Sequence, residues 1–461
     1  MNITNPILNT DSYKLGHFRQ YPPEISAISG YITTRGQSFR PEVVFFGLQM
    51  FLKEHLSRAI TAADIAEAEE ISRLHGQPFN REGWEYIVNT HGGYLPLRID
   101  ALPEGTAVRR DVPMVQVVNT DPKLPWVTSY IETALLRAIW YPSTVASNAR
   151  RIWQTLAPLY ESTSDDAQEM LPLALSDFGA RGVASAEQAG LGGAAHLLYF
   201  HRTDTLAAIL AARKYYGAEM AGRSIPASEH TTMVAWGLER ETDAYANMIE
   251  SFSEFGAYSV VSDSFDIANA VAEIWGKTLQ DKVRNAGATL IVRPDSGDPI
   301  DTPVQVVAQL AYAFGTKQNS KGYKVIDGNA RVLQADGLTT QDITMVLGRL
   351  EGMGFAAENI SFGMGGSLLQ KVNRNSYSFT MKCSAKQNDD GKWHDMSRLP
   401  PNPQEKLPRA GRRAVAEIDG ALFDMHVDEL AGRENLLQPV WENGRLLKDL
   451  SFAEIRARAA L

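Results

Sequence analysis

The chain has 461 residues, with 45 Lys and Arg against 54 Asp and Glu, and a formal net charge of −9. Hydrophobic residues make up 44% and charged residues 21%, which indicates a folded globular protein of two or three domains rather than a disordered or fibrous chain. The net acidity argues against a protein that coats nucleic acid, since such a protein needs a broad excess of Lys and Arg. The single cysteine, Cys383, excludes an intramolecular disulfide and a cysteine-based zinc cluster.

Neither a secretory signal nor a membrane span is expected. The first 14 residues lack a basic region followed by an apolar stretch. No apolar run reaches the length of about 18 residues that a membrane-spanning helix needs. We therefore expect a cytoplasmic protein that binds neither a membrane nor nucleic acid.

The first 150 residues mix short strands with a few helices. The pattern predicts a strand over Ile28–Thr33 and an apolar helix over Thr128–Trp140, which should end at the following Tyr141–Pro142 step. At the other end of the chain, a Pro-rich basic loop at 397–413 precedes short strands and a terminal helix. We expect residues 385–461 to fold back on the N-terminal region and to form one α+β domain with residues 1–150.

From about residue 170, short apolar runs alternate with amphipathic helices, and each run ends in a motif that contains Gly or an acidic residue. The seven runs are Leu171–Gly179, His196–Thr205, Gly222–His230, Tyr258–Asp266, Ala288–Asp298, Ala330–Gly337 and Asn359–Gly366. Repeated strand–helix units imply parallel strands, and seven in succession favour a barrel. We predict an irregular parallel β/α barrel over residues 151–384, with chemistry in the loops that follow its strands.

Three of these motifs suit recognition of a small planar ligand. Phe178 and Arg181 could stack on and hold a flat ring, although a core Phe with a salt-bridged Arg is an alternative. Asp204 could accept a hydrogen bond from an amide NH₂ group, or it could cap the helix that begins near Thr205. His230, next to an acidic residue, could act in catalysis or serve a purely structural role.

Two further motifs suit a phosphorylated sugar. In RPDSGD, Arg293 and Asp295 could bind an anion and a diol together. Other strand-end carboxylates could bind ribose hydroxyls or water-coordinated Mg²⁺, or could be ordinary turn and cap residues; they are Asp263, Asp266 and Asp336. The turn Gly363–Gly366 could offer backbone N–H groups to a phosphate, or be a plain tight turn. A basic set follows it, which a solvated basic face would also explain: Lys371, Arg374 and Lys382.

No Walker A, GxGxxG, HExxH or GxSxG pattern occurs, so nucleotide hydrolases, dinucleotide enzymes and serine esterases lose support. The residues alone therefore indicate a barrel enzyme that acts on a phosphorylated sugar or a nucleotide.

Together the motifs resemble the bacterial-type nicotinamide phosphoribosyltransferases over nearly the whole chain. The matching stretches are TDSYKLGHFRQYPP, FFGLQ, SDFGARG, RTDT, SIPASEHTT, SVVSDSFDI, IVRPDSGDP, LQADG, FGMGGSLLQKVNR and MKCS. The resemblance implies a type II phosphoribosyltransferase-like fold. It also implies transfer of phosphoribosyl from phosphoribosyl pyrophosphate to nicotinamide, which gives nicotinamide mononucleotide and pyrophosphate in NAD salvage.

The resemblance further implies a homodimer with shared active sites, to which the α+β domain contributes at the interface. Mg²⁺ would be held mainly by substrate phosphates, so no residue is named as its direct ligand. ATP would be a possible coupled co-substrate.

The resemblance assigns roles to individual residues. The nicotinamide ring would lie between Phe178 and Tyr13 of opposite subunits, with Asp204 on the amide and Arg293 beside the ring. Ribose would be bound by Asp295 and Asp336. Phosphate and pyrophosphate would be bound by Arg35, Arg181, Arg374, Lys382, Gly365 and Gly366. Asp11 and Ser224 would be further substrate contacts, and Asp266 would belong to the phosphate and Mg²⁺ region. His230 would be phosphorylated when ATP is used, and the predicted catalytic residues are His230, Asp295 and Arg293.

The chain departs from the family pattern in the basic loop at 394–412, where Arg398 and Lys406 replace a lysine cluster, and at Ala335 and Met364. Two alternatives remain. Nicotinate phosphoribosyltransferase would need a cation opposite the substrate carboxylate, for which Arg202 is a candidate and which Asp204 opposes. A catalytically silent nucleotide-binding barrel would not require the full set of site residues.

Overall fold

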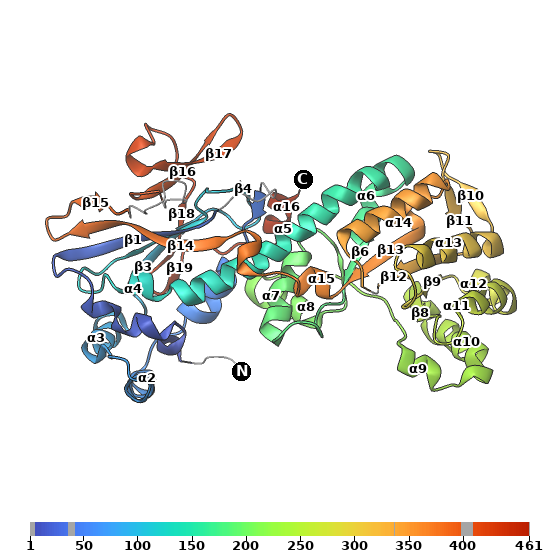
Figure 1. The fold of residues 1–461 in the computed structure, drawn as a ribbon, viewed down its shortest axis with the longest axis horizontal. Helices are drawn as coiled ribbons and strands as arrows, with labels where there is room; N and C mark the ends of the chain where they lie inside the picture. Colours follow the sequence, from blue (N-terminus) through green and yellow to red (C-terminus); the bar gives the residue numbers. More distant parts are fainter. Residues whose placement is uncertain (1–4, 36–41, 336, 398–408, 461) are drawn as a thin grey trace. The chain divides into compact units, whose positions relative to one another are not determined.

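The computed structural model describes residues 5–35, 42–335, 337–397 and 409–460 (Figure 1). The chain divides into two compact units. The first unit consists of Met1–Ser147, Ala212–Ala218 and Asn373–Leu461. The second unit consists of Asn148–Ala211 and Glu219–Val372.

A seven-stranded antiparallel sheet forms the centre of the first unit, in the order β15–β14–β1–β5–β3–β18–β19. Its strands are β1 (Ile25–Thr34), β3 (Leu97–Ala101), β5 (Val115–Asn119), β14 (Phe379–Asn388), β15 (Trp393–Asp395), β18 (Gln438–Glu442) and β19 (Arg445–Leu446). Two separate antiparallel pairs are β2 (Glu42–Val44) with β4 (Ala107–Arg109), and β16 (Arg413–Ile418) with β17 (Ala421–His426). The predicted strand at Ile28–Thr33 is therefore confirmed as part of β1.

The helices of this unit are short. They are η1 (Pro6–Leu8), η2 (Ser12–Arg19), α1 (Leu48–Phe51), η3 (Leu52–Leu56), α2 (Ala62–Leu74), α3 (Arg81–His91), α4 (Val127–Tyr130), η9 (Arg374–Ser376), η10 (Val427–Glu429) and α16 (Phe452–Ala459). A buried aromatic cluster joins α3 to α4: the Trp84 ring packs edge-on against Trp126 and Tyr130, with centroid separations of 4.9 and 5.1 Å. The core of this unit thus lies between these helices and the sheet.

Two segments lie in the first unit although the sequence predicted them in the barrel. Residues 373–384 belong there because β14 pairs antiparallel with β1 along its length. Residues 212–218 belong there because the Gln49 side-chain amide donates a hydrogen bond to the Tyr215 carbonyl at 2.9 Å. Both corrections come from contacts between residues far apart in the sequence.

The predicted helix end at the Tyr141–Pro142 step is wrong, because α5 (Glu132–Thr163) continues through Pro142. Packing around the proline compensates for the missing helical hydrogen bond. Gly47, with a φ of 105°, lies so close that a Cβ would be 2.5 Å from the Pro142 ring. The Ser143 hydroxyl then exchanges hydrogen bonds of 3.0 Å with the backbone of Phe46. This tertiary contact overrides the local preference to end the helix.

The second unit contains a six-stranded parallel sheet in the order β7–β6–β13–β12–β9–β8. Its strands are β6 (Leu175–Asp177), β7 (Arg202–Thr203), β8 (Ala257–Val261), β9 (Thr289–Arg293), β12 (Ala330–Gln334) and β13 (Ile360–Met364). The sheet is irregular at its two edges: Arg223 bridges Arg202 of β7, and Ala227 bridges Ser259 of β8. Pro226, which has no N–H to donate, explains why this connecting segment forms bridges rather than a regular strand. The predicted irregular parallel barrel is confirmed.

Helices follow most of the barrel strands, and α13 contacts both β12 and α14. The helices are α6 (Ala167–Met170), η4 (Leu171–Leu173), α7 (Ala186–His196), α8 (Leu206–Tyr216), α9 (His230–Val234), η5 (Leu238–Arg240), α10 (Glu241–Phe252), η6 (Ser253–Phe255), α11 (Ile267–Asn269), η7 (Ala270–Thr278), α12 (Gln280–Asn285), α13 (Asp301–Phe314), α14 (Thr340–Gly352), η8 (Ala357–Asn359) and α15 (Gly366–Leu369). A hairpin of β10 (Thr316–Gln318) and β11 (Lys324–Ile326) follows α13. Within the described ranges, no helix is both long and apolar enough to cross a bilayer.

Candidate active site

Polar segments follow the carboxyl ends of the barrel strands, and these ends share one edge because the strands are parallel. The predicted residues that lie in these segments of the second unit are Phe178, Arg181, Asp204, Ser224, His230, Asp266, Arg293, Asp295, Gly365 and Gly366. The first unit carries the other described ones, which are Asp11, Tyr13, Arg35, Arg374 and Lys382. The predicted residues are therefore divided between the two units.

Phe178 lies directly after β6 and is half-buried. Its backbone N–H donates to the Met364 carbonyl at 2.9 Å, which ties this turn to the end of β13. The ring lies against Gly363, where a Cβ would be 2.5 Å from a ring carbon. A glycine at this position therefore makes room for the aromatic side chain.

Asp204 lies directly after β7 and is solvent-exposed. Its carboxylate accepts a hydrogen bond from the Ser224 hydroxyl. Helix α8 begins two residues later, but no helix N–H within the described chain donates to this carboxylate, so the capping alternative gains no support. The pKa of Asp204 is raised, mainly because the surrounding protein disfavours its charged form and partly because Asp177 is near, while Ser224 and the charge of Arg293 oppose the rise.

His230 is the first residue of α9 and is placed between two carboxylates. Its Nε2 lies 3.3 Å from Asp263 Oδ1, and its Nδ1 lies 3.8 Å from Asp295 Oδ2. The imidazole is 47% exposed, whereas the Asp263 side chain is only 3% exposed. The histidine is thus oriented from the protein side and accessible from the solvent side.

Asp263 is a functional candidate to which the sequence analysis gave no specific role. Besides the His230 ring, its carboxylate accepts hydrogen bonds from the Asp295 backbone N–H at 2.9 Å and from the Ser296 hydroxyl. It therefore links the end of β8 to the RPDSG turn after β9. Its position between two serines at a strand end was visible in the sequence, but its burial and its three partners were not.

Arg293 is the last residue of β9, and its side chain is 12% exposed. Its Nε lies 3.4 Å from Asp295 Oδ1, too poorly aligned to count as a hydrogen bond, and is a buried donor without a hydrogen-bond partner in the described chain. Buried donors are nearly always paired in native proteins. The Arg293 Nε is an exception whose nearest acceptor is the Asp295 carboxylate, so the guanidinium is held beside that residue at the end of β9.

For Asp266, the alternative that the carboxylate caps a helix is confirmed. Its Oδ1 accepts hydrogen bonds from the N–H groups of Ala268 and Asn269, at 2.9 and 3.1 Å, and so caps α11. Gly365 directly precedes α15, which begins at Gly366. No contact of these residues tests the ligand roles that the resemblance implies.

In the first unit, three predicted cations lie around the start of β14. An Nη atom of Arg35 donates to the Thr380 hydroxyl at 3.1 Å, and one of Arg374 donates to the Phe379 carbonyl at 2.8 Å. Lys382 lies on β14 itself. The sheet therefore gathers a basic group that is widely spaced in the sequence.

The other predicted residues of this unit lie near η2. The Tyr13 side chain is 57% exposed, and its ring centroid is 5.2 Å from that of His17. Asp11 accepts a hydrogen bond from the Thr133 hydroxyl at 2.5 Å. Three positions named in the sequence analysis lie outside the described residues: Asp336, Arg398 and Lys406.

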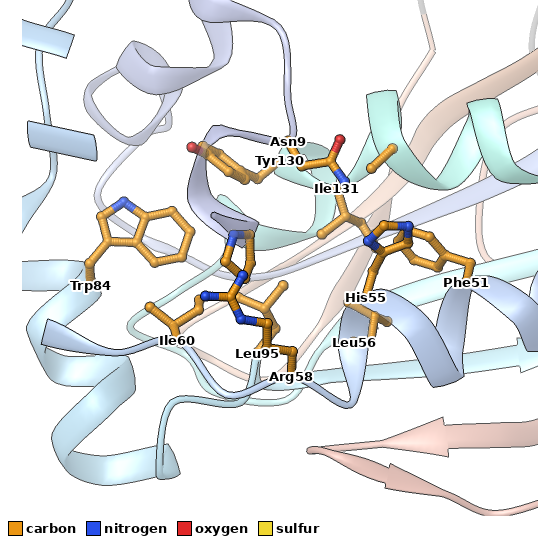
Figure 2. A pocket seen from close by; sticks show the side chains of 12 residues that line it. Asn9, Phe51, His55, Leu56, Arg58, Ile60, Trp84, Leu95, Tyr130 and Ile131 are labelled. Carbon is orange, nitrogen blue, oxygen red and sulfur yellow. The ribbon is translucent and has the colours of Figure 1, made fainter. Parts of the chain in front are cut away.

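A small cavity in the first unit is not part of this site (Figure 2). It has a volume of about 40 Å³ and lies among Trp84, Tyr130, His55 and Arg58. That volume suits a few water molecules. No predicted site residue lines this cavity, and we assign it no substrate.

Arg202, the cation that a nicotinate substrate would need, is largely buried, and burial lowers its pKa. It lies near Tyr160, whose neutral hydroxyl donates to the carbonyl of Ile360, the first residue of β13. The site lies at the opposite ends of the strands. The guanidinium is therefore placed toward their amino ends rather than beside Asp204.

Two family models match the chain. The model described as the nicotinate phosphoribosyltransferase (NAPRTase) family matches residues 173–430, and the model described as the nicotinamide phosphoribosyltransferase N-terminal domain matches residues 5–99. A nicotinamide phosphoribosyltransferase of Xanthomonas campestris pv. campestris is 46% identical over 464 residues, covering 99% of this chain and 98% of the relative. One of Acinetobacter baylyi is 31% identical over 492 residues, covering 99% and 97%.

The fold is also similar to that of solved structures. The nicotinate-nucleotide pyrophosphorylase of Pyrococcus furiosus aligns with a TM-score of 0.65 at 16% identity, covering 100% of this chain and 96% of the other. The human nicotinic acid phosphoribosyltransferase aligns with a TM-score of 0.55 at 19% identity, covering 98% and 92%. These two likenesses concern the fold alone. The model over residues 173–430 shows membership of the NAPRTase family, and the full-length identity to the two bacterial relatives shows that the chain belongs to the nicotinamide phosphoribosyltransferases.

Proposed function

We propose that this chain transfers the phosphoribosyl group of phosphoribosyl pyrophosphate to the ring nitrogen of nicotinamide, giving nicotinamide mononucleotide and pyrophosphate. The observation that carries the choice of base is the exposed Asp204 carboxylate, which has one hydroxyl partner and lies after the strand that neighbours Phe178. A carboxylate accepts a hydrogen bond from an amide NH₂ group, but it repels the carboxylate of nicotinate.

Base recognition combines stacking with this hydrogen bond. Phe178 supplies one aromatic face, and Tyr13 of a second protomer supplies the other. Stacking orients the ring nitrogen, which is already nucleophilic, toward the sugar carbon C1. No covalent nucleophile from the protein is required.

Charge stabilisation supports departure of pyrophosphate. As the bond at C1 breaks, positive character develops on the ribose and negative charge on the leaving group. Preorganised cations stabilise that negative charge without having to move. We assign this role to Arg35, Arg181, Arg374 and Lys382, with the backbone N–H groups of Gly365 and Gly366 on the phosphate. Asp295 and Asp336 bind the ribose hydroxyls, and Arg293 lies beside the ring.

Mg²⁺ fits this site as a companion of the substrate phosphates. Within the described residues, no three His, Cys, Asp or Glu side chains are placed to ligate one metal ion. Mg²⁺ usually keeps several waters and binds through substrate phosphates with one or two carboxylates. Asp266 Oδ2 has no protein partner in the described chain and suits such a water-mediated contact. The bound ion supplies positive charge at the pyrophosphate.

His230 is the residue we assign to ATP coupling. The terminal phosphoryl group of ATP moves to an imidazole nitrogen, and its bond to ADP breaks as the nitrogen–phosphorus bond forms. Asp263 Oδ1 lies 3.3 Å from the Nε2 atom, which supports this role by fixing the orientation of the ring. The exposed side of the imidazole remains accessible to a nucleotide.

The direct test measures nicotinamide mononucleotide formed from nicotinamide and phosphoribosyl pyrophosphate with Mg²⁺, with and without ATP, beside a parallel reaction with nicotinate. We expect product from nicotinamide, little from nicotinate, loss of product after chelation of Mg²⁺, and stimulation by ATP. Preferential use of nicotinate would overturn the choice of base. Binding of nicotinamide mononucleotide without any turnover would instead support a catalytically silent barrel.

The proposed homodimer has a separate test. Phe178→Ala and Tyr13→Ala remove the two aromatic faces of each site. If the faces come from opposite subunits, mixing the two variants restores both faces in about a quarter of the sites, and activity at nicotinamide concentrations below KM then exceeds that of either variant alone. If both faces come from one subunit, mixing restores nothing.

A further inference from the structure

Asp177, the last residue of β6, is a buried carboxylate for which neither the sequence analysis nor the proposed reaction accounts. Its exposed fraction is 0%, and within the described chain no Lys, Arg or His forms an ion pair with it. A buried carboxylate is costly unless its oxygens are hydrogen-bonded. Its retention at the edge of the candidate site therefore calls for a physical reason.

The carboxylate of Asp177 binds two segments of the chain. Oδ1 accepts a hydrogen bond from the Gly179 backbone N–H at 2.7 Å, and Oδ2 accepts one from the Thr203 hydroxyl at 3.3 Å. On the helix side, a Cβ at Gly193 of α7 would lie 3.1 Å from Oδ2. The side chain thus points away from the barrel interior and is enclosed by α7, so a bound base would not touch it.

Both segments held by Asp177 carry base-recognition groups. Gly179 closes the turn that presents the Phe178 ring. Thr203 precedes Asp204, whose backbone N–H donates to the Asp177 carbonyl at 2.9 Å. One residue therefore fixes the turn of the stacking ring and the loop of the amide acceptor on neighbouring strands.

We propose that Asp177 is a positioning residue for the base: its buried carboxylate sets the spacing between the Phe178 ring and the Asp204 carboxylate, and so determines affinity for nicotinamide without contacting it. This inference rests on the proposed function. A misplacement of about 1 Å in a binding constellation is enough to change affinity or rate markedly.

Asp177 also acts on Asp204 through charge. The groups that face Asp204 are the Ser224 hydroxyl, the Arg293 guanidinium from β9 and Asp177 from β6. Asp177 is the one negative charge among them, and it contributes to the raised pKa of Asp204. Replacing it with a neutral residue should make Asp204 ionise at lower pH.

The test compares Asp177→Asn with wild type in full steady-state kinetics. We expect the KM for nicotinamide to rise about tenfold while the KM for phosphoribosyl pyrophosphate changes less than about twofold. The acid limb of kcat/KM for nicotinamide should shift to lower pH. If Asp177 only stabilised the fold, its replacement would change neither the ratio of the two KM values nor the pH at which kcat/KM falls on the acid side.

Glu241→Gln is the matched control, because Glu241 is another buried acid of the same unit, 4% exposed, and its carboxylate binds the Tyr245 hydroxyl at 2.7 Å. It should leave the KM ratio unchanged. Thr203→Val removes one hydrogen bond of Asp177, together with the acceptor of the Thr205 backbone N–H, and should raise the KM for nicotinamide two- to threefold even where Asp177→Asn fails to fold.

Two outcomes would overturn the inference: an unchanged KM for nicotinamide in a folded Asp177→Asn protein, or equal increases in both KM values. Failure of the proposed function looks different, since wild type itself would then form no nicotinamide mononucleotide. The wild-type assay therefore comes first.

Discussion

Asp204 and Asp263 lie at the same edge of the barrel, yet the protein uses them in opposite ways. Asp263 is buried and accepts hydrogen bonds from the His230 ring, the Asp295 backbone and the Ser296 hydroxyl. Asp204 is exposed and has one hydroxyl partner. A carboxylate whose oxygens are occupied by the protein positions its neighbours, whereas one with spare acceptor capacity is available to a ligand. A position at the end of a strand does not by itself show which of these two roles a carboxylate has.

We expect the largest effect from replacing Asp263, whose carboxylate oxygens accept hydrogen bonds from the protein. Asp263→Asn keeps the shape but replaces one acceptor oxygen with a donor, which disturbs His230 and the RPDSG turn together. We expect kcat to fall about a hundredfold, ATP stimulation to be lost, and stability to fall by about 1–3 kcal/mol. Steady-state kinetics with and without ATP, and thermal unfolding, measure all three.

Asp298→Asn is a suitable comparison for this variant. Asp298 lies in the same turn, but its carboxylate binds only local backbone N–H groups, those of Ile300 and Asp301 at 2.9 and 2.7 Å. Asn keeps an oxygen that accepts from the same N–H groups, so kcat should stay within about twofold of wild type. Equal losses of kcat in the two variants would remove the special role of Asp263.

The exposed carboxylate should show a smaller and more selective effect. Asp204→Asn weakens the acceptor for the nicotinamide NH₂ group, so we expect the KM for nicotinamide to rise about tenfold, with less discrimination against nicotinate. Folding should change little, because Ser224 is its one side-chain partner in the described chain. Parallel losses of melting temperature and activity would instead favour a structural capping role.

The stacking ring gives the next effect in size. Phe178→Ala should raise the KM for nicotinamide about fivefold, because an aromatic contact contributes about 1 kcal/mol. Gly363→Ala should act in the same direction, since its Cβ would displace the Phe178 ring. Gly348→Ala, where a Cβ meets nothing within 4 Å, is the matched control and should leave this KM unchanged. An unaltered KM in Phe178→Ala would contradict the stacking role.

The barrel and its polar edge could be predicted from the sequence because strand–helix alternation and strand-end motifs are local patterns. The positions of Asp204, His230 and Arg293 in the polar segments of this edge were predicted in this way. The positioning groups were not, because the burial of Asp177 and Asp263 depends on α7 and on the turn after β9. Helix α5 continues through Pro142 for the same kind of reason, since its stabilising partner, Gly47, is distant in the sequence.

The roles of Arg35, Arg374 and Lys382 could be named only through the resemblance. They lie on different segments, and the pairing of β1 with β14 is what gathers them. That pairing joins residues more than three hundred positions apart, which no local pattern indicates. The same pairing moved residues 373–384 out of the predicted barrel.

The smallest expected effect is a pH-dependent change in melting temperature. The sign of this change should differ between a carboxylate that is available to a ligand and one that accepts hydrogen bonds from backbone N–H groups. The pKa of Asp204 is raised in the folded protein, so its charged form opposes folding. Asp204→Asn should therefore raise the melting temperature near pH 7, by at most about 2 °C because the group is exposed. This gain should vanish toward about pH 3, where the wild-type carboxyl is largely neutral in both states.

Asp298 should give the opposite sign. Two backbone N–H groups hold its pKa below the ordinary value, so its charged form favours folding above that value and loses this contribution as the pH falls. Asp298→Asn should lower the melting temperature near pH 7 and lose its effect in acid. Melting curves of both variants between pH 3 and pH 8 test the contrast. Shifts of the same sign at neutral pH would mean that Asp204 is stabilised by the fold rather than reserved for substrate.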